Sequence, residues 1–121
     1  NAFTLIGRTD QRRTRSRTPI AQLVAAAPGD LPIVLLVHRP SEFEEAAQSG
    51  VAIQLSGHTH DGQLFPANLV TRREYPLSRG HLVKGGTHFF VTSGVQGWGP
   101  PVRTVGASEI LVLRAALRDG L

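Results

Sequence analysis

The sequence of 121 residues predicts an α/β fold, and three observations support this prediction. Residues 33–37 form a continuous apolar, β-branched run, which is typical of a strand buried on both faces. A helix signal follows at residues 41–48, and a second strand-like run at residues 51–55 comes next. A β-α-β unit of this kind is parallel and right-handed in nearly all proteins. The length fits a single domain over residues 1–121.

The chain before this unit predicts a strand, a loop and a helix. Residues 3–7 are a short apolar run closed by glycine, as expected of a strand. Residues 8–17 are polar and basic without periodicity, so we expect a loop. Thr18 and Pro19 then predict a capped helix start, with an apolar face that extends to residue 27.

Within and after the β-α-β unit, turn residues set the expected boundaries. Ser41 and Glu44 predict a capping box for the helix, and Gly50 predicts its end. Beyond residue 55 we expect mainly β structure. The expected segments are an irregular stretch at 61–86, a strand at 88–92, a glycine-proline loop at 93–101 and a last strand at 109–113.

The composition excludes some classes of protein. The chain has no cysteine, which excludes disulfides and thiolate metal ligands. It has no apolar run near the ~18 residues that cross a bilayer. Thirteen Lys and Arg against nine Asp and Glu give a net charge of +4. Because the chain begins at Asn1 and enters a strand almost at once, we expect a fragment of a longer protein.

Three histidines follow the two strands of the predicted parallel unit. His38 ends the first strand, and His58 and His60 follow the second one after Gly57. The carboxyl ends of parallel strands meet at one edge of a sheet, where ligands bind. Neutral imidazole is a common ligand of Zn, Mn, Fe and Ni. His-x-His alone is as typical of a surface or core pair, but His38 at the same edge favours a metal site.

The stretches "LLVHRP", "LSGHTHDGQLFP", "SGVQGWGPPVR" and "SEI" resemble the C-terminal half of the calcineurin-like metallophosphoesterase family. The most similar branch is bacterial and often membrane-tethered. The resemblance covers nearly the whole chain and is firmest over residues 33–113. It implies one half of a metallophosphoesterase α/β sandwich, with the chain as a partial domain of that family.

The resemblance also implies a chemistry. Family members use two divalent ions such as Mn, Fe or Zn, bridged by a hydroxide that attacks the phosphorus of a phosphate mono- or diester. By resemblance, His38 and His58 bind one ion and His60 binds the other. The family's Asp-x-His, Gly-Asp-x-x-Asp and Gly-Asn-His motifs are absent from this sequence, and with them the histidine that assists the leaving group. The chain then supplies three of roughly seven ligands, so we expect it to hold one ion or none and to be inactive alone.

Four further residues are candidates for supporting the metal or the substrate. Gly57 lets the backbone turn into the histidine pair. Gln63 can bind a ligating ring or the substrate, and packing of its loop is an equal alternative. Two roles are considered for Trp98: it lines the cleft beside the substrate, or it is a partly buried structural residue. The structural role is favoured. For Arg103, a phosphate contact is weighed against a plain surface position, which is favoured.

Three other polar residues carry weaker expectations. Asp10 follows a strand near the same edge but has no accompanying histidine, so we do not expect it to bind metal. His81 and His88 are expected to be structural.

The sequence leaves two alternatives to the enzyme. One is a non-catalytic module that binds metal or self-associates, or that pairs with its missing half through an open sheet edge. The other is a nucleic-acid- or lipid-binding domain, suggested by five arginines within residues 8–17. No aromatic residue lies among them to stack on bases, which disfavours nucleic acid. The expected partner is a phosphoester. Any membrane attachment, with the catalytic domain outside the cytoplasm, requires a segment upstream of this chain.

Overall fold

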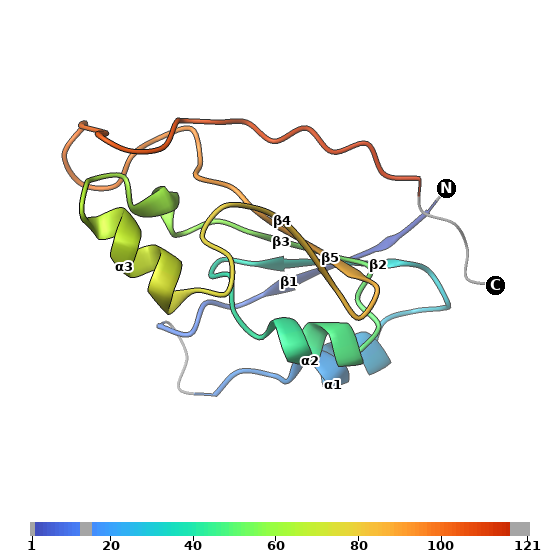
Figure 1. Ribbon diagram of the computed structural model, residues 1–121. Helices are drawn as coiled ribbons and strands as arrows, with labels where there is room; N and C mark the ends of the chain where they lie inside the picture. Colours follow the sequence, from blue (N-terminus) through green and yellow to red (C-terminus); the bar gives the residue numbers. More distant parts are fainter. Residues whose placement is uncertain (1, 13–15, 117–121) are drawn as a thin grey trace.

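The computed structural model describes residues 2–12 and 16–116, which form a five-stranded sheet with helices packed on one of its faces (Figure 1). The strand order is β1-β2-β3-β5-β4, and only β4 is antiparallel to its neighbour. The α/β prediction is confirmed. The strands are β1 (Thr4–Arg8), β2 (Ile33–Val37), β3 (Ile53–Ser56), β4 (Gly80–Lys84) and β5 (Thr87–Val91). The helices are α1 (Ile20–Ala25), α2 (Phe43–Gln48), the 3-10 turn η1 (His60–Gly62) and α3 (Ala67–Glu74).

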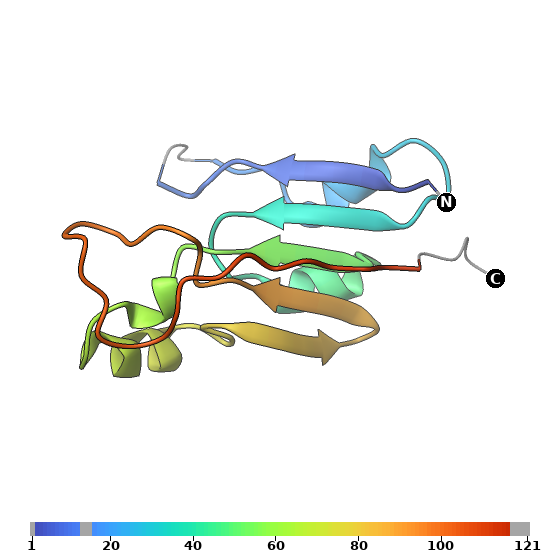
Figure 2. The same cartoon turned by 90° about the horizontal axis from the view of Figure 1, so that it is seen from above.

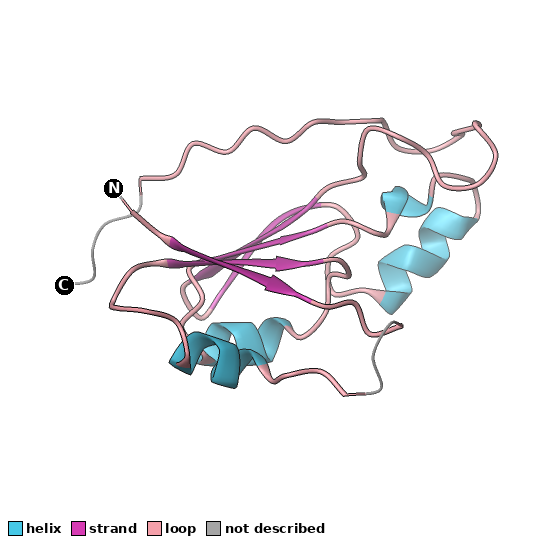
Figure 3. Cartoon of the chain, turned by 180° about the vertical axis from the view of Figure 1, so that it is seen from behind, coloured by secondary structure: helices cyan, strands magenta, loops and turns pink. Residues whose placement is uncertain are grey.

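The predicted parallel unit is present as β2, α2 and β3. Its strands pair in parallel, with Val34 opposite Ile53 and Leu36 opposite Leu55. Helices α1 and α2 cover the same face of the sheet (Figure 3), and α3 lies beyond the carboxyl ends of the strands. The core lies between this helix pair and the sheet, where Phe43 and Phe89 stack at 4.2 Å.

Both predicted helix caps are wrong, although both helices form. Helix α1 begins after Pro19, and its first amide, that of Ile20, donates to Glu45 Oε1 of α2 at 2.6 Å. Helix α2 begins after Glu42, which adopts a left-handed conformation with no side-chain cap. Ser41 therefore makes no capping box, and its buried hydroxyl has no partner among the described residues. A contact between two helices replaces a local cap, and such a contact cannot be predicted from spacing.

The other face of the sheet carries the C-terminal segment, which is not the strand expected at 109–113. Residues 107–116 cross this face in an extended conformation (Figures 1 and 2). Within the described part of the chain they join no sheet, and Ile110 and Val112 are 78% and 79% exposed. The apolar run at 110–113 predicted an extended backbone correctly (Figure 1). A local run of this kind does not specify a partner strand, and the segment crosses the face of the sheet instead of joining an edge (Figure 2).

The stretch 61–86, expected to be irregular, contains η1, α3 and the edge strand β4. It is therefore not mainly β. Positive φ angles at His58, His60, Asp61 and Gln63 turn the chain sharply between β3 and α3. Helix α3 has Asn68 as its buried residue and presents no apolar stripe to the core, so its sequence lacked the periodicity that predicts a helix.

The arginine-rich segment is not a uniformly solvated loop. The side chains of Arg8 and Arg17 are 5% and 9% exposed, and both form ion pairs with Glu42 of the turn before α2. Arg13 and Arg15 lie outside the described residues. Pairing of two of the arginines with a carboxylate weakens the case for a basic binding surface. No helix among residues 2–12 and 16–116 has the length and apolar character that spanning a membrane requires.

Candidate metal centre at the carboxyl end of the sheet

The three candidate histidines line one cleft of about 540 Å³ at the carboxyl end of the sheet. His38 follows β2, and His58 and His60 follow β3, so the parallel unit brings them to one edge as expected. The cleft is completed by two of the other candidates and by charged and small residues. Its remaining lining residues are Asp10, Arg12, Arg39, Thr59, Gly62, Gln63, Ala67, Thr71 and Trp98.

His38 and His58 face each other directly. His38 Nε2 and His58 Nδ1 are 3.0 Å apart, and the ring centroids lie at 4.8 Å with the planes 65° apart. Two nitrogens bound to one ion at ~2.0–2.1 Å lie about 3.0–3.4 Å apart. The pair is joined by a hydrogen bond between the two rings, and its separation is also close to that of two ligands of a single ion.

The turn that carries the histidines is held by short-range and long-range hydrogen bonds. The Gly57 amide donates to the His38 carbonyl at 3.1 Å, which joins the ends of β2 and β3. The Thr59 hydroxyl donates to the carbonyl of Ser78 at 2.6 Å and accepts the Asp61 amide at 3.3 Å. These bonds support the left-handed backbone at His58, where φ is 70°. Such conformations are typical of functional turns.

His60 occupies a different part of the cleft. Its Nδ1 is buried and has no hydrogen-bond partner among the described residues. A buried ring nitrogen without a partner is unfavourable, and a metal ion or a group from outside this chain would satisfy it. The backbone carbonyl of His60 accepts a hydrogen bond from Arg103 Nη1 at 2.9 Å, which holds the residue in place.

The electrostatic surroundings keep His58 suited to metal binding. Burial is the main cause that lowers the pKa of His58, and the charge of Arg39 and the neighbouring His38 lower it further. The neutral ring, which is the form that binds metal, is therefore favoured. Burial, the largest single influence, would raise the pKa of Asp10, but Arg39, 3.1 Å away, the Gln11 amide and His38 together outweigh it and lower the pKa overall. Asp10 is thus an ionised partner of Arg39 beside the histidines.

The donor set fits a divalent transition metal, but this chain alone does not complete a site. Imidazole nitrogens suit Zn, Fe and Mn. Within residues 2–12 and 16–116 no three His, Cys, Asp or Glu side chains lie close enough together to hold an ion. His38 and His58 form a two-ligand pair, and His60 lies apart from it. The assignment of these three histidines as ligands stays a prediction.

Gln63 binds the glycine-proline loop rather than a ligating ring. Its buried side chain donates through Nε2 to the carbonyls of Trp98, Pro100 and Val102 at 2.8, 3.2 and 2.9 Å. Its Oε1 accepts the Trp98 amide. The geometry thus agrees with loop packing. Trp98 itself is 74% exposed and lines the cleft, so the favoured expectation of a partly buried indole is wrong.

The Arg103 side chain donates hydrogen bonds to backbone carbonyls. Besides the His60 carbonyl it contacts the carbonyl of Ser93, at 3.4 Å, and it is only partly exposed, so it is not a plain surface residue. The sequence reasoning missed Arg39, which lies in the cleft between Asp10 and His58. The signal was available, because Arg39 follows His38 at the same strand end.

His81 and His88 lie away from the cleft, on β4 and β5. His81 Nε2 and His88 Nδ1 are 3.0 Å apart, and the ring of His81 stacks on Phe90 at 4.3 Å. His88 thus has a histidine neighbour that the sequence did not predict. The pair connects the edge strand to the sheet.

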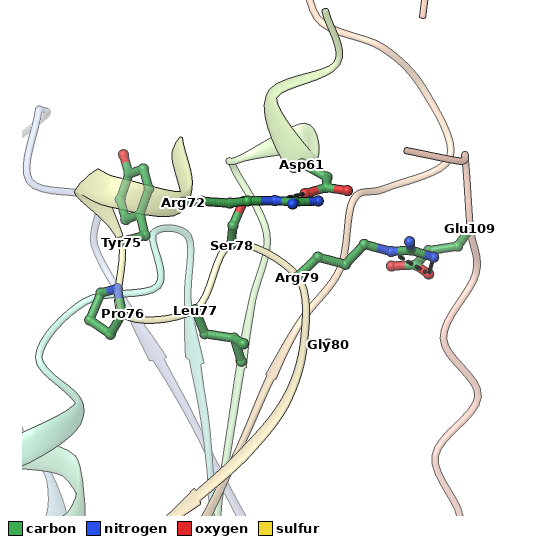
Figure 4. Close-up of a pocket in the computed structure, with 9 residues that line it drawn as sticks. All are labelled: Asp61, Arg72, Tyr75, Pro76, Leu77, Ser78, Arg79, Gly80 and Glu109. Atoms are coloured by element: carbon green, nitrogen blue, oxygen red, sulfur yellow. Dashed lines mark hydrogen bonds and ion pairs between the residues drawn. The ribbon is translucent and has the colours of Figure 1, made fainter. Parts of the chain in front are cut away.

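A second cavity of about 510 Å³ lies between α3, β4 and the C-terminal segment (Figure 4). Figure 4 shows Arg72 directed at Asp61 and Arg79 at Glu109. The hydrogen bond from Arg79, 2.7 Å long, and the Ser93 amide lower the pKa of Glu109 to about 2. Because its charges are paired within the wall, this cavity supports the structure, and the histidine cleft remains the candidate site.

The chain is similar to several proteins named metallophosphoesterases. It is 38% identical over 85 residues to an uncharacterized metallophosphoesterase of Helicobacter pylori, covering 69% of this chain and 23% of that protein. It is 39% identical over 90 residues to a transmembrane protein with metallophosphoesterase domain of Danio rerio, covering 70% and 21%. An uncharacterized metallophosphoesterase of Bacillus subtilis is 34% identical over 83 residues, covering 65% and 29%. The resemblance inferred from the sequence is confirmed.

The matches cover most of this chain but only a part of each relative. The chain spans between 21% and 29% of the length of these three proteins. No family model and no solved structure matches it.

Proposed function

We propose that this chain, a relative of the metallophosphoesterases, supplies part of a divalent-metal centre that hydrolyses a phosphate mono- or diester. The observation that carries the proposal is the pair formed by His38 and His58, whose nitrogens lie 3.0 Å apart in the cleft at the sheet edge. The lowered pKa of His58 supports it, because a neutral ring can bind metal. The unpartnered Nδ1 of His60 supports a second ligand position.

In this proposal each histidine has a defined role. His38 and His58 hold one ion, and His60 contributes to a second. Two bound divalent ions, when present, lower the pKa of a bridging water and stabilise the charge on the phosphate oxygens. Burial, aided by the charge of Arg39, lowers the pKa of His58 and favours its neutral ring, and Asp10 holds Arg39. The remaining ligands and the leaving-group histidine come from outside this chain.

The proposal therefore assigns different activities to the chain alone and to the longer protein. Alone, with three imidazoles and with the one carboxylate of the cleft, that of Asp10, paired to Arg39, the chain binds one ion weakly or none and does not turn over substrate. In the full-length protein the centre is complete and active. We also propose that the full-length protein is membrane-associated with its catalytic domain outside the cytoplasm. The name of the Danio rerio relative supports the membrane link.

The test compares two histidine variants of the full-length protein. His58→Ala removes one of the paired nitrogens, so bound Mn or Zn and hydrolysis of bis(p-nitrophenyl) phosphate should both fall at least about 100-fold. His81→Ala, outside the cleft, is the matched control and should retain both. Metal content is measured by mass spectrometry after dialysis. If His58→Ala keeps its metal and its turnover, the assignment of the site is wrong.

A second candidate is that the chain acts as a self-associating, non-catalytic module. The face of the sheet opposite α1 and α2 favours it, because Leu5, Leu36 and Val83 on that face are 56%, 39% and 50% exposed. An apolar, partly covered sheet face is stabilised by a partner. Sedimentation of the chain decides between the two. A discrete metal-free dimer supports the module, and a metal-binding monomer argues against it.

A further inference from the structure

We infer that the cleft selects phosphoesters whose ester group is an aromatic ring, and that this ring stacks on the indole of Trp98. The inference rests on the proposed phosphoesterase function and specifies its substrate class. It begins from an unusual combination at Trp98. The indole is 74% exposed, while the backbone of the same residue is among the most firmly bonded parts of its loop.

The buried amide of Gln63 fixes the backbone of Trp98. It accepts the Trp98 amide and donates to the Trp98 carbonyl at 2.8 Å, so both polar backbone atoms of this residue are bound by one side chain. Gly97 allows this approach, because a Cβ there would lie 3.0 Å from Gln63 Oε1. The loop is also bound to the Gln63 carbonyl by the amides of Thr104 and Val105. A side chain presented on a fixed backbone loses little entropy when it binds a ligand.

The cleft that the indole faces carries a positive charge. Arg12 and Arg39 line it against the single carboxylate of Asp10. A ligand held there is therefore anionic at the histidine end. The end near Trp98 meets an exposed indole.

The other residues that line the cleft favour a single ring over a longer apolar chain as the ester group of the substrate. Among the described residues that line the cleft, Trp98 is the only large apolar side chain. Several of the other lining residues are small: Gly62, Ala67 and Thr71. An acyl chain or a protein side-chain cluster needs several aliphatic neighbours along its length. One exposed aromatic surface beside small residues suits a single flat ring, which stacks on it face to face with an offset.

The direct test uses Trp98 as its own reporter, since it is the only tryptophan in the chain. Its fluorescence is titrated with phenylphosphonate, methylphosphonate and octylphosphonate, with and without zinc; none of these can be hydrolysed as an ester. Stacking predicts that phenylphosphonate binds about tenfold or more tightly than methylphosphonate. Equal affinities overturn the inference. Tightest binding by octylphosphonate also overturns it and indicates an aliphatic, lipid-like ester.

The second test uses the full-length protein and compares phenyl phosphate with methyl phosphate. Trp98→Ala should lower kcat/KM for the phenyl ester about tenfold and leave that for the methyl ester unchanged, whereas Trp98→Phe should retain both. Phe65→Ala, which removes another exposed aromatic ring that does not line the cleft, is the control. An equal loss for both esters overturns the inference.

The two tests also separate this inference from the proposed function. If no phosphoester is hydrolysed, the proposed function fails, and preferential binding of phenylphosphonate to the chain still supports an aromatic anion site. If esters are hydrolysed without preference for the ring, the proposed function stands and the role of Trp98 is refuted.

Discussion

Replacement of Gln63 by alanine should release residues 98–102 from the rest of the fold. The Gln63 side chain is buried, and it binds three carbonyls and one amide of residues 98–102. No other described side chain bonds to the backbone of Trp98. The variant therefore removes the support that holds the indole beside the cleft.

The size of the effect follows from these bonds. An amide group has two protons for three acceptors, so one of the three contacts is shared. Each net hydrogen bond contributes about 1 kcal/mol, and the exposed loop carbonyls regain water when released. We expect the free energy of unfolding to fall by about 2–4 kcal/mol, which lowers Tm on the order of 10 °C.

The assay combines urea unfolding, followed by circular dichroism, with the fluorescence anisotropy of Trp98. Gln63→Ala should lower both the unfolding free energy and the anisotropy. Gln96→Ala, an exposed glutamine in the same loop, should change neither. Gln63→Glu adds a sharper test, because its carboxylate cannot donate to the loop carbonyls until acid protonates it. A loss below about 0.5 kcal/mol with unchanged anisotropy would refute the reasoning.

Three further predictions use the same urea assay. Glu109, whose pKa is lowered from 4.5 to about 2, stabilises the fold fully above pH 4.5 and loses this contribution as the pH falls toward 2. The parent chain should lose about 1–2 kcal/mol over this range, allowing for exposure of the ion pair, and Glu109→Gln should lose less. Gly62→Ala places a Cβ 2.2 Å from the backbone of α3 and should cost more than about 3 kcal/mol. Gly29→Ala, also at positive φ but in open space, should cost about 1 kcal/mol. Glu45→Ala removes the acceptor of the first amide of α1 and should cost about 1 kcal/mol, whereas Glu44→Ala, which breaks an exposed ion pair, should cost less than about 0.5 kcal/mol.

The sequence predicted the parts of the fold whose cause is local. The short, β-branched apolar run at 33–37 favoured a buried strand, and the parallel unit it opens sets where His38 and His58 meet. That reasoning placed the histidines at the correct edge of the sheet, because strand direction and handedness leave little freedom. It could not predict the 3.0 Å separation between the ring nitrogens of His38 and His58, which depends on the left-handed turn at His58.

The parts that were missed depend on residues far apart in the chain. The cap of α1 comes from Glu45, 25 residues later, and the loop at Trp98 is bound by Gln63, 35 residues earlier. Arg8 reads as part of a basic loop in sequence but is buried against Glu42, 34 residues away. Spacing within one element cannot predict such pairs.

The two parts of the candidate site, the histidine pair and the Trp98 loop, depend on the same turn. The histidine pair is set by the ends of β2 and β3, and the Trp98 loop is set by Gln63, three residues after His60 on the same turn. One short segment, residues 57–63, therefore positions both His58 and His60, two of the three candidate metal ligands, and the aromatic wall. A change that moved this turn would displace both together. For this reason Gln63→Ala, which frees only the wall, separates recognition of the ester group from binding of the metal: it should weaken phenylphosphonate binding and leave the affinity of His38 and His58 for zinc unchanged.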